Sequence, residues 1–290
     1  MALLAVPAAW AQPVQKIPPI TPMAHEIYSI SHQDMSWHEH EYRIFMAAPK
    51  QASPNAHKPA ALYILDGNAQ FPLAVNAAQK QWEQASETPN QSAQLPLIVG
   101  LGYPETTAYP QKARTRDYTY AAPGEAFADG GGAADFYRFL DSQVRPYINK
   151  RFATDPERQI LSGHSFAGLF TLFVLLNHAE KFNHYIIGSP SLWWGKGAIV
   201  TNAKMPAQAV RSATILQGEY EENPKADPNI TPERLARIQN RSSAMTARQL
   251  TAWLQNHNIN SHFILVPKSN HGAVIPAVIE TAVRTALNGY

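Results

Sequence analysis

The sequence predicts an α/β protein with a mostly parallel central sheet and helices on both faces. Short apolar runs ending in turn residues alternate along the chain with longer segments of three- and four-residue periodicity. Strands buried on both faces form near-continuous apolar runs, and alternation of strands with helices is typical of a parallel sheet. The chain has 290 residues and no break in composition, so we expect a single domain over residues 12–290.

The expected elements follow one another in a regular order. We expect strands at 25–30, 42–47, 60–65, 97–101, 159–162, 185–188, 214–217 and 262–266, and helices at 136–148, 166–178, 232–256 and 275–287. Pro146 should kink the first helix, and the prolines up to Pro22 favour an extended lead-in. Residues 104–132 lack periodicity and are expected to form a long loop over the active site.

The composition excludes several classes of function. With no cysteine, the chain has no disulfide, no thiolate metal site and no cysteine nucleophile. A formal net charge of +2 gives no basic field for nucleic acid. Phosphate-loop and dinucleotide-binding motifs are absent, and we interpret the three glycines at 130–132 as a loop hinge. His38 and His40 would share one face of a strand but have no third ligand nearby, so we expect neither a metal nor another cofactor.

An apolar stretch opens the chain. Residues 1–11 read MALLAVPAAWA, and their last three residues fit the small-x-small pattern of a cleavage site, although no Lys or Arg precedes them. We therefore expect residues 1–11 to be a signal-peptide remnant and the protein to act in a bacterial periplasm or outside the cell. No apolar run approaches the ~20 residues of a membrane span.

The segment LSGHSFAG at 161–168 predicts a serine nucleophile. It lies between an expected strand and an apolar helix, the setting of a nucleophile elbow that lifts a serine hydroxyl above the sheet. The usual pattern is G-x-S-x-G, whereas here Ala167 takes the fifth place and Gly168 follows. Alanine has the smallest side chain that could replace that glycine, so Ser165 remains the predicted nucleophile.

The order of the chain indicates the partners of Ser165. A general base is expected after the last strand, where His271 precedes a glycine; His257 and His262 fall at a helix end and inside a strand. The orienting acid is expected after the preceding strand. Glu221 lies three residues beyond Gly218, with Glu219, then Glu222 and Asp227, as alternatives.

Two backbone N–H groups are expected to stabilise an oxyanion. One belongs to Phe166, the residue after the nucleophile, and the other to the turn after the strand at 60–65. Gly67 is the predicted donor in that turn and Asn68 the second choice, while a simple capped turn is the alternative. Asn68 is also a candidate for contact with substrate.

These motifs resemble the putative-esterase branch of the α/β-hydrolases, and within it the siderophore trilactone esterases of the enterobactin, salmochelin and bacillibactin type. The matching stretches are LYILDGNA at 62–69, RTRDYT at 114–119, GHSFAGLF at 163–170, GSPSLWW at 188–194 and NHG at 270–272. The resemblance implies the α/β-hydrolase fold, a small-molecule ester substrate and hydrolysis through an acyl-enzyme. Some members of the group use a serine–histidine pair without an acid, whereas GEYE at 218–221 looks like the members that keep a glutamate.

A ferric trilactone siderophore of the catecholate type is a trianion, so nearby cations would help to bind it. Arg114 and Arg116 are candidates because they fall in the expected long loop, although Arg116 could instead pair with Asp117. Trp193 and Trp194 could form the wall of an aryl-binding pocket or pack in the core.

Other functions share this pattern. A general short-chain or aryl carboxylesterase, or an acyltransferase that passes the acyl group to an alcohol, would use the same elbow. A binding protein on the hydrolase scaffold would lack the nucleophile or the base, and both are present here. The sequence does not indicate the oligomeric state.

Overall fold

An eight-stranded sheet forms the centre of the computed structural model, which describes residues 16–50, 57–87, 93–201, 203, 212–240 and 243–288. The strands lie in the order β1-β2-β4-β3-β5-β6-β7-β8, antiparallel from β1 to β4 and parallel from β4 to β8. Their bounds are β1 Tyr28–Trp37, β2 His40–Pro49, β3 Ala61–Ile64, β4 Leu97–Gly102, β5 Gln159–His164, β6 His184–Gly188, β7 Ser212–Gly218 and β8 Ser261–Val266. The predicted α/β class with a mostly parallel sheet is confirmed. The expected leader at 1–11 lies outside the described residues.

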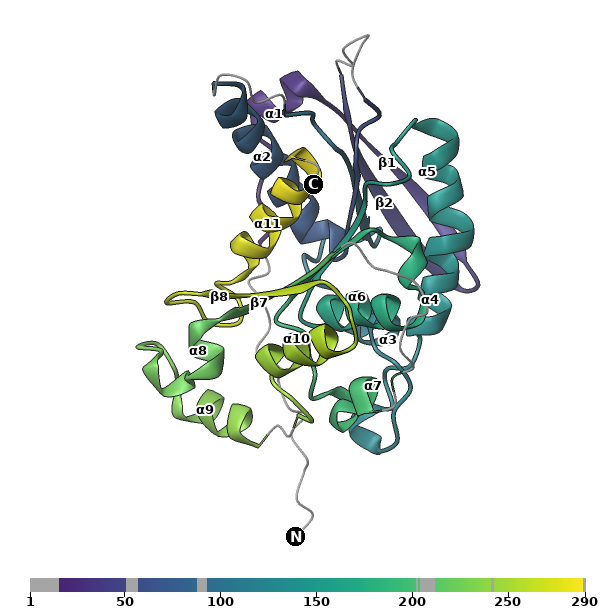
Figure 1. Cartoon of the computed structure of the whole chain (residues 1–290). Coiled ribbons are helices and arrows are strands. Elements are labelled where there is room, and N and C mark those ends of the chain that lie inside the picture. The colour runs from purple at the N-terminus through teal and green to yellow at the C-terminus, as the bar shows by residue number, and fades with distance from the viewer. Residues whose placement is uncertain are drawn as a thin grey trace.

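Helices cover both faces of the sheet (Figure 1). Helices α1, α2 and α11 lie on one face, while α3, α4, α5, α6 and α10 lie on the other. The helix bounds are α1 Pro22–Ile27, α2 Gly67–Ser86, α3 Gln111–Tyr118, α4 Ala133–Phe139, α5 Arg145–Arg151, α6 Phe166–Asn177, α7 Ala198–Thr201, α8 Glu219–Glu222, α9 Pro232–Gln239, α10 Ala247–Asn256 and α11 Ile275–Asn288. Within the described residues, no helix is long and apolar enough to cross a membrane.

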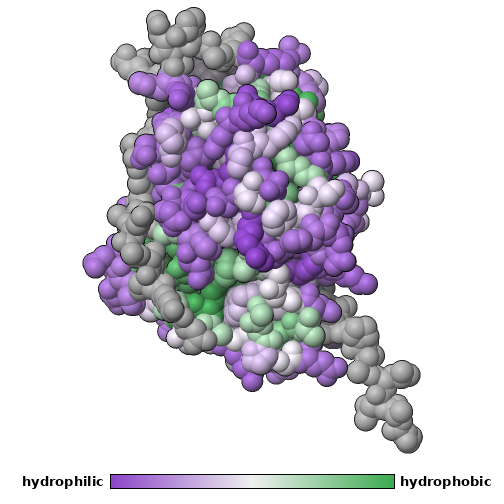
Figure 2. Space-filling view, turned by 90° about the vertical axis from the view of Figure 1, so that its right-hand side faces the viewer, coloured by the Kyte–Doolittle hydropathy of each residue, from purple (hydrophilic) through white to green (hydrophobic). Residues whose placement is uncertain are grey.

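Two apolar cores lie on opposite faces of the sheet, because successive side chains of a strand point in opposite directions. On β3, Leu62 and Ile64 pack towards α2 and α11, whereas Tyr63 packs towards the α6 side. All four residues of β3 are buried, which explains why this strand reads as a continuous apolar run rather than an alternating one. The outer surface is mostly hydrophilic on the face in Figure 2, with hydrophobic side chains gathered in its lower part.

The beginning of the chain differs from the sequence prediction. Residues 25–30 were expected to be a strand, but α1 occupies Pro22–Ile27 and β1 begins at Tyr28. Pro22 lies at the start of α1, where a helix has no partner for its N–H, and the Thr21 side chain accepts from the N–H of Ala24. The proline that was expected to prevent a helix therefore begins one.

Several helices depart from their predicted bounds. Helix α2 was not predicted at all, and α3 lies within the expected loop at 104–132. A π-helical turn, Leu140–Val144, separates α4 from α5, so Pro146 lies in the first turn of α5 instead of kinking a continuous helix. The single helix expected at 232–256 is instead α9 and α10. Thr246 caps α10 in a capping box with Gln249, a start signal that the periodicity obscured.

A buried ion pair joins α3 to the turn between β3 and α2. The guanidinium of Arg114 donates to both carboxylate oxygens of Asp66, from Nε at 2.5 Å and from Nη2 at 2.9 Å. Only 3% of Arg114 and 2% of Asp66 is exposed. The backbone N–H of Asp66 donates to the Tyr118 hydroxyl at 3.1 Å. These contacts fix the turn that carries Gly67.

Replacing Arg114 should test the importance of this pair. Arg114→Ala would leave the Asp66 carboxylate buried without a partner, and we expect the free energy of unfolding to fall by about 3–5 kcal/mol in urea denaturation. Arg43→Ala is the matched control, since Arg43 makes the same two-point contact with Asp34 at 2.7 Å on the surface. Its loss should cost less than about 1 kcal/mol. Equal costs for the two variants would contradict a special role for the buried pair.

Candidate active site

A strained turn between β5 and α6 presents Ser165. Its backbone has φ 63° and ψ −117°, a conformation that a non-glycine residue adopts only when its surroundings impose it. The neighbouring positions must be small: a Cβ on Gly163 would lie 2.3 Å from the Ala167 oxygen, and one on Gly168 would lie 2.6 Å from the Gly188 oxygen. Ala167 itself is fully buried, so the alanine in the motif is compatible with the turn.

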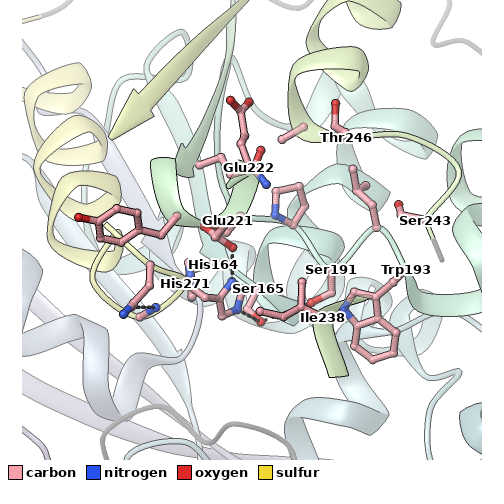
Figure 3. Close-up of a pocket in the computed structure, with 18 of the residues that line it drawn as sticks. His164, Ser165, Ser191, Trp193, Glu221, Glu222, Ile238, Ser243, Thr246 and His271 are labelled. Carbon is pink, nitrogen blue, oxygen red and sulfur yellow. Dashed lines mark hydrogen bonds and ion pairs between the residues drawn. The ribbon is translucent and has the colours of Figure 1, made fainter. Parts of the chain in front are cut away.

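Three side chains form a continuous line of hydrogen bonds at this turn (Figure 3). His271 Nε2 lies 3.0 Å from Ser165 Oγ, and His271 Nδ1 lies 2.6 Å from Glu221 Oε2. The three residues come from the β5–α6 turn, the segment between β8 and α11, and α8 directly after β7. These loops meet because β5, β6, β7 and β8 are parallel and neighbouring, so their carboxyl ends share one edge of the sheet.

The carboxylate of Glu221 is held on both oxygens. Oε1 accepts hydrogen bonds from the Ser189 hydroxyl at 2.6 Å and from the Gly218 N–H at 2.9 Å. Burial disfavours the charged form, yet the neighbouring His271 and these donors outweigh it and lower the pKa of Glu221 to about 2. Glu221 is therefore ionised at neutral pH. Ser189 was not singled out from the sequence, and its φ of 38° is the local irregularity that marks it in the structure.

Asn270 and Asp227 shape the loop that carries His271. The Asn270 side-chain oxygen accepts from the N–H groups of Gly272 and Ala273, both at 3.2 Å. Its amide nitrogen donates to Asp227 Oδ2 at 3.2 Å, and Asp227 is buried. Asp227, weighed from the sequence as a possible triad acid, instead contacts the loop of His271 through Asn270. The pairing of these residues across 43 positions of chain had no sequence signal.

His164, the residue before Ser165, packs against His271. The rings of His164 and His271 lie 4.6 Å apart between centroids, and His164 is buried. Within the described chain, its Nε2 has no hydrogen-bond partner. Burial, together with the charge of His271, lowers the pKa of His164 to about 3, so the ring stays neutral during any reaction near pH 7. No sequence motif indicated a role for His164.

The two predicted oxyanion donors lie in the turns that follow the neighbouring strands β5 and β3. Phe166 is the first residue of α6 and lines the cavity beside Ser165. Gly67 begins α2 after β3, the strand that pairs with β5. A Cβ on Gly67 would lie 2.9 Å from the backbone carbons of Gly100 and Leu101, so this close approach requires glycine. Gly67 is not among the residues that line the cavity.

A cavity of about 990 Å³ opens next to Ser165. Trp193 and Ile238 lie on the other side of the serine from His271 in Figure 3. Phe166 and Tyr109 add further aromatic surface, and Ser191 Oγ lies 3.3 Å from Ser165 Oγ. The surface of the whole cavity is thus more apolar than polar, and its aromatic groups could hold a flat ring of a substrate.

Among the predicted substrate contacts, Arg114 reaches the cavity with its guanidinium held by Asp66. Arg116, Trp194 and Asn68 do not line the cavity. Arg116 donates to both carboxylate oxygens of Asp117, the pairing considered from the sequence, and also contacts His40 and Tyr42.

Trp194 and Asn68 are held by backbone groups. Trp194 is 1% exposed and donates to the Tyr120 carbonyl. The Asn68 side chain forms hydrogen bonds with the backbone of Tyr103 and Glu105. Trp193 does line the cavity, as predicted.

Comparison with known proteins gives a consistent family. Residues 36–269 match the family model described as "Putative esterase". The ferri-bacillibactin esterase BesA of Bacillus subtilis is 30% identical over 264 residues, which cover 85% of each chain. The apo-salmochelin esterase of Escherichia coli is 30% identical over 197 residues, covering 62% of this chain and 59% of that protein.

Solved structures share the fold. The crystal structure of the BES protein from Bacillus cereus superposes with a TM-score of 0.70 at 25% identity, over 94% of this chain and 98% of the other. The siderophore hydrolase EstB from Aspergillus nidulans has a TM-score of 0.74 at 22% identity and covers 91% of this chain and 95% of its own. These matches agree with an α/β-hydrolase type of fold.

The neutral, buried state of His164 predicts a pH dependence of stability. Its pKa is about 3 in the folded protein against 6.5 in a free histidine, so only the unfolded chain takes up this proton between these values. The stabilisation is complete above pH 6.5 and is lost as the pH falls towards 3, at about 1.4 kcal/mol per pH unit for one proton. In His164→Gln, the free energy of unfolding measured with urea at pH 4–6 should depend less steeply on pH, by about 1.4 kcal/mol per pH unit. An unchanged slope would contradict the buried, neutral histidine.

Proposed function

The chain belongs to the Putative esterase family, and from that premise we propose that it is a serine hydrolase that opens the ester bonds of a siderophore trilactone through an acyl-enzyme. The observation that carries the proposal is the continuous arrangement of Ser165, His271 and Glu221, with contacts of 3.0 and 2.6 Å. A nucleophile, a base within hydrogen-bonding reach and a group that orients the base are the requirements of this chemistry.

In the first step, His271 Nε2 accepts the proton of Ser165 as Oγ bonds to the ester carbonyl carbon. The carbonyl π electrons move onto oxygen, and the N–H groups of Phe166 and Gly67 stabilise the resulting oxyanion. The tetrahedral intermediate collapses, the carbon–oxygen bond to the alcohol breaks, and His271 gives its proton to the leaving oxygen. Water then attacks the acyl-enzyme, with His271 again taking and returning a proton, and releases the acid and Ser165.

Glu221 contributes by orienting and stabilising charge. As an anion it accepts a hydrogen bond from the N–H group at His271 Nδ1, which leaves Nε2 free to face Ser165 and favours the imidazolium that forms during attack. Ser189 and Gly218 prevent the carboxylate from rotating away. Because the pKa of Glu221 is about 2, this support should persist throughout the pH range in which His271 works as a base.

Two features support a trilactone as the substrate. Relatives described as esterases of ferri-bacillibactin and apo-salmochelin match this chain at 30% identity. The cavity of about 990 Å³ is large and carries Trp193, Phe166 and Tyr109 as aromatic surface beside the nucleophile. As part of the same proposal, the apolar stretch at 1–11 supports action in the periplasm or outside the cell.

Incubation with trilactone siderophores tests the substrate directly. We expect the wild-type protein to convert iron-free or ferric enterobactin-type trilactone to linear products, resolved by mass, faster than it cleaves short-chain aryl esters. Ser165→Ala should reduce both reactions to background, since it removes the hydroxyl that lies within hydrogen-bonding reach of His271 Nε2. Cleavage of aryl esters alone would refute the siderophore substrate, and full activity of Ser165→Ala would refute the mechanism.

Replacement of Glu221 tests the orienting acid. Glu221→Ala should lower kcat by about 10²–10⁴-fold with a smaller change in KM, because the imidazolium in the transition state loses its partner. Glu219→Gln is the control: Glu219 accepts from the Lys268 N–H at 2.7 Å, and glutamine preserves an acceptor there. Near wild-type rates for Glu221→Ala would show that the reaction needs only the serine and histidine.

A further inference from the structure

Helix α9 stands apart from the layers that cover the sheet. In Figure 1 it lies below α8, beyond the carboxyl ends of the strands. None of its residues is buried, yet it is regular and capped, with the Thr231 side chain accepting from the N–H of Arg234. Because α9 contributes no buried side chain to either core, its role depends on what its partly exposed side chains face.

One side of this segment faces the cavity beside Ser165. Arg234, Arg237 and Ile238 of α9 line the cavity, as does Ile230 just before the helix. Within α9, Arg237 and Ile238 follow Arg234 by three and four residues, which places these three side chains on one side of the helix. Glu233, the acidic residue of α9, is exposed and does not line the cavity. The helix therefore directs cationic and apolar groups, but not its carboxylate, towards the substrate.

The carboxylates that line the same cavity already have partners. Glu221 binds His271, Ser189 and Gly218, and Glu222 pairs with Arg248 at 3.2 Å from two nitrogen atoms. Asp227 accepts from Asn270 and from the N–H of Asn229. Within the described residues, the Arg234 side chain has no recorded ion pair, and it is half-buried. Arg234 thus brings a positive charge to the cavity where the acids are otherwise engaged.

Aromatic groups complete this environment. Trp193 and Phe166, whose ring centroids lie 5.7 Å apart, line the cavity together with Ile238. An aromatic ester group could lie against these side chains, while a negative charge on that group would be attracted by the guanidinium. A neutral ester would gain the apolar contacts alone.

Resting on the proposed function, we infer that α9 makes the enzyme selective for ester substrates with an anionic aromatic group, and that Arg234 is the principal residue responsible, assisted by Arg237. The selected class includes catecholate rings in their charged, metal-bound form. The role concerns binding and leaves proton transfer to Ser165 and His271.

Matched nitrophenyl esters test this selectivity without a siderophore. The probes are nitrophenyl benzoate and its analogue with one carboxylate on the benzoyl ring. Arg234→Gln should lower kcat/KM for the charged ester about fivefold, as expected for one partly solvated ion pair, and change that for the neutral ester less than twofold. The preference of the wild type for the charged ester should also weaken with salt, and this salt effect should shrink in the variant.

A net-charge control separates contact from long-range field. Arg284→Gln removes one positive charge on α11, on the other side of the sheet, and should alter neither ester's kcat/KM. Equal losses for both esters in Arg234→Gln, no loss for either, or the same loss in Arg284→Gln would overturn the inference. If the wild type failed to cleave a trilactone, the proposed substrate would be refuted. The effect of Arg234→Gln on the charged and neutral nitrophenyl esters could still be measured, because these probes are simple esters.

Discussion

The site depends on the strained backbone of Ser165. A non-glycine residue at φ 63° and ψ −117° costs on the order of 1–3 kcal/mol, so the surroundings must hold it. They do so from two sides: the Ser165 N–H donates to the Gly188 carbonyl at 2.9 Å, and the Ser165 carbonyl accepts from the N–H groups of Leu169 and Ser191. Strand β6, helix α6 and the segment after β6 are thereby joined at one residue. The same contacts explain why glycines flank the serine and why its hydroxyl points out of the sheet.

The meeting of Ser165, Glu221 and His271 could be predicted because their positions follow from chain order and sheet geometry. Ser165 lies between a strand and a helix, while Glu221 and His271 follow the next strands along one edge, and each has a local signal in a turn or a glycine. The parallel sheet then brings them together without any further information. The fold class was predictable for a related reason, because β3 and β4 are buried on both faces and appear in the sequence as apolar runs.

What escaped prediction depends on contacts between distant segments or on competition between local signals. The ion pair of Arg114 with Asp66 spans 48 positions, so the sequence could not distinguish a structural arginine from one that faces substrate. Asn68 and Trp194 are likewise occupied by backbone groups that lie far along the chain. The division between α9 and α10 was missed for the other reason, since an apolar periodicity continued across the capping box at Thr246.

The hydrogen bond between Asp227 and Asn270 has a consequence for how such an enzyme can diversify. It attaches Asp227, at the start of the segment that contains α9, to the loop of His271. At the other end of this segment, Thr246 caps helix α10. The intervening stretch of chain can therefore change in length and composition with both ends fixed. Changes in this stretch could therefore alter which substrates fit the cavity without displacing Ser165, His271 or Glu221.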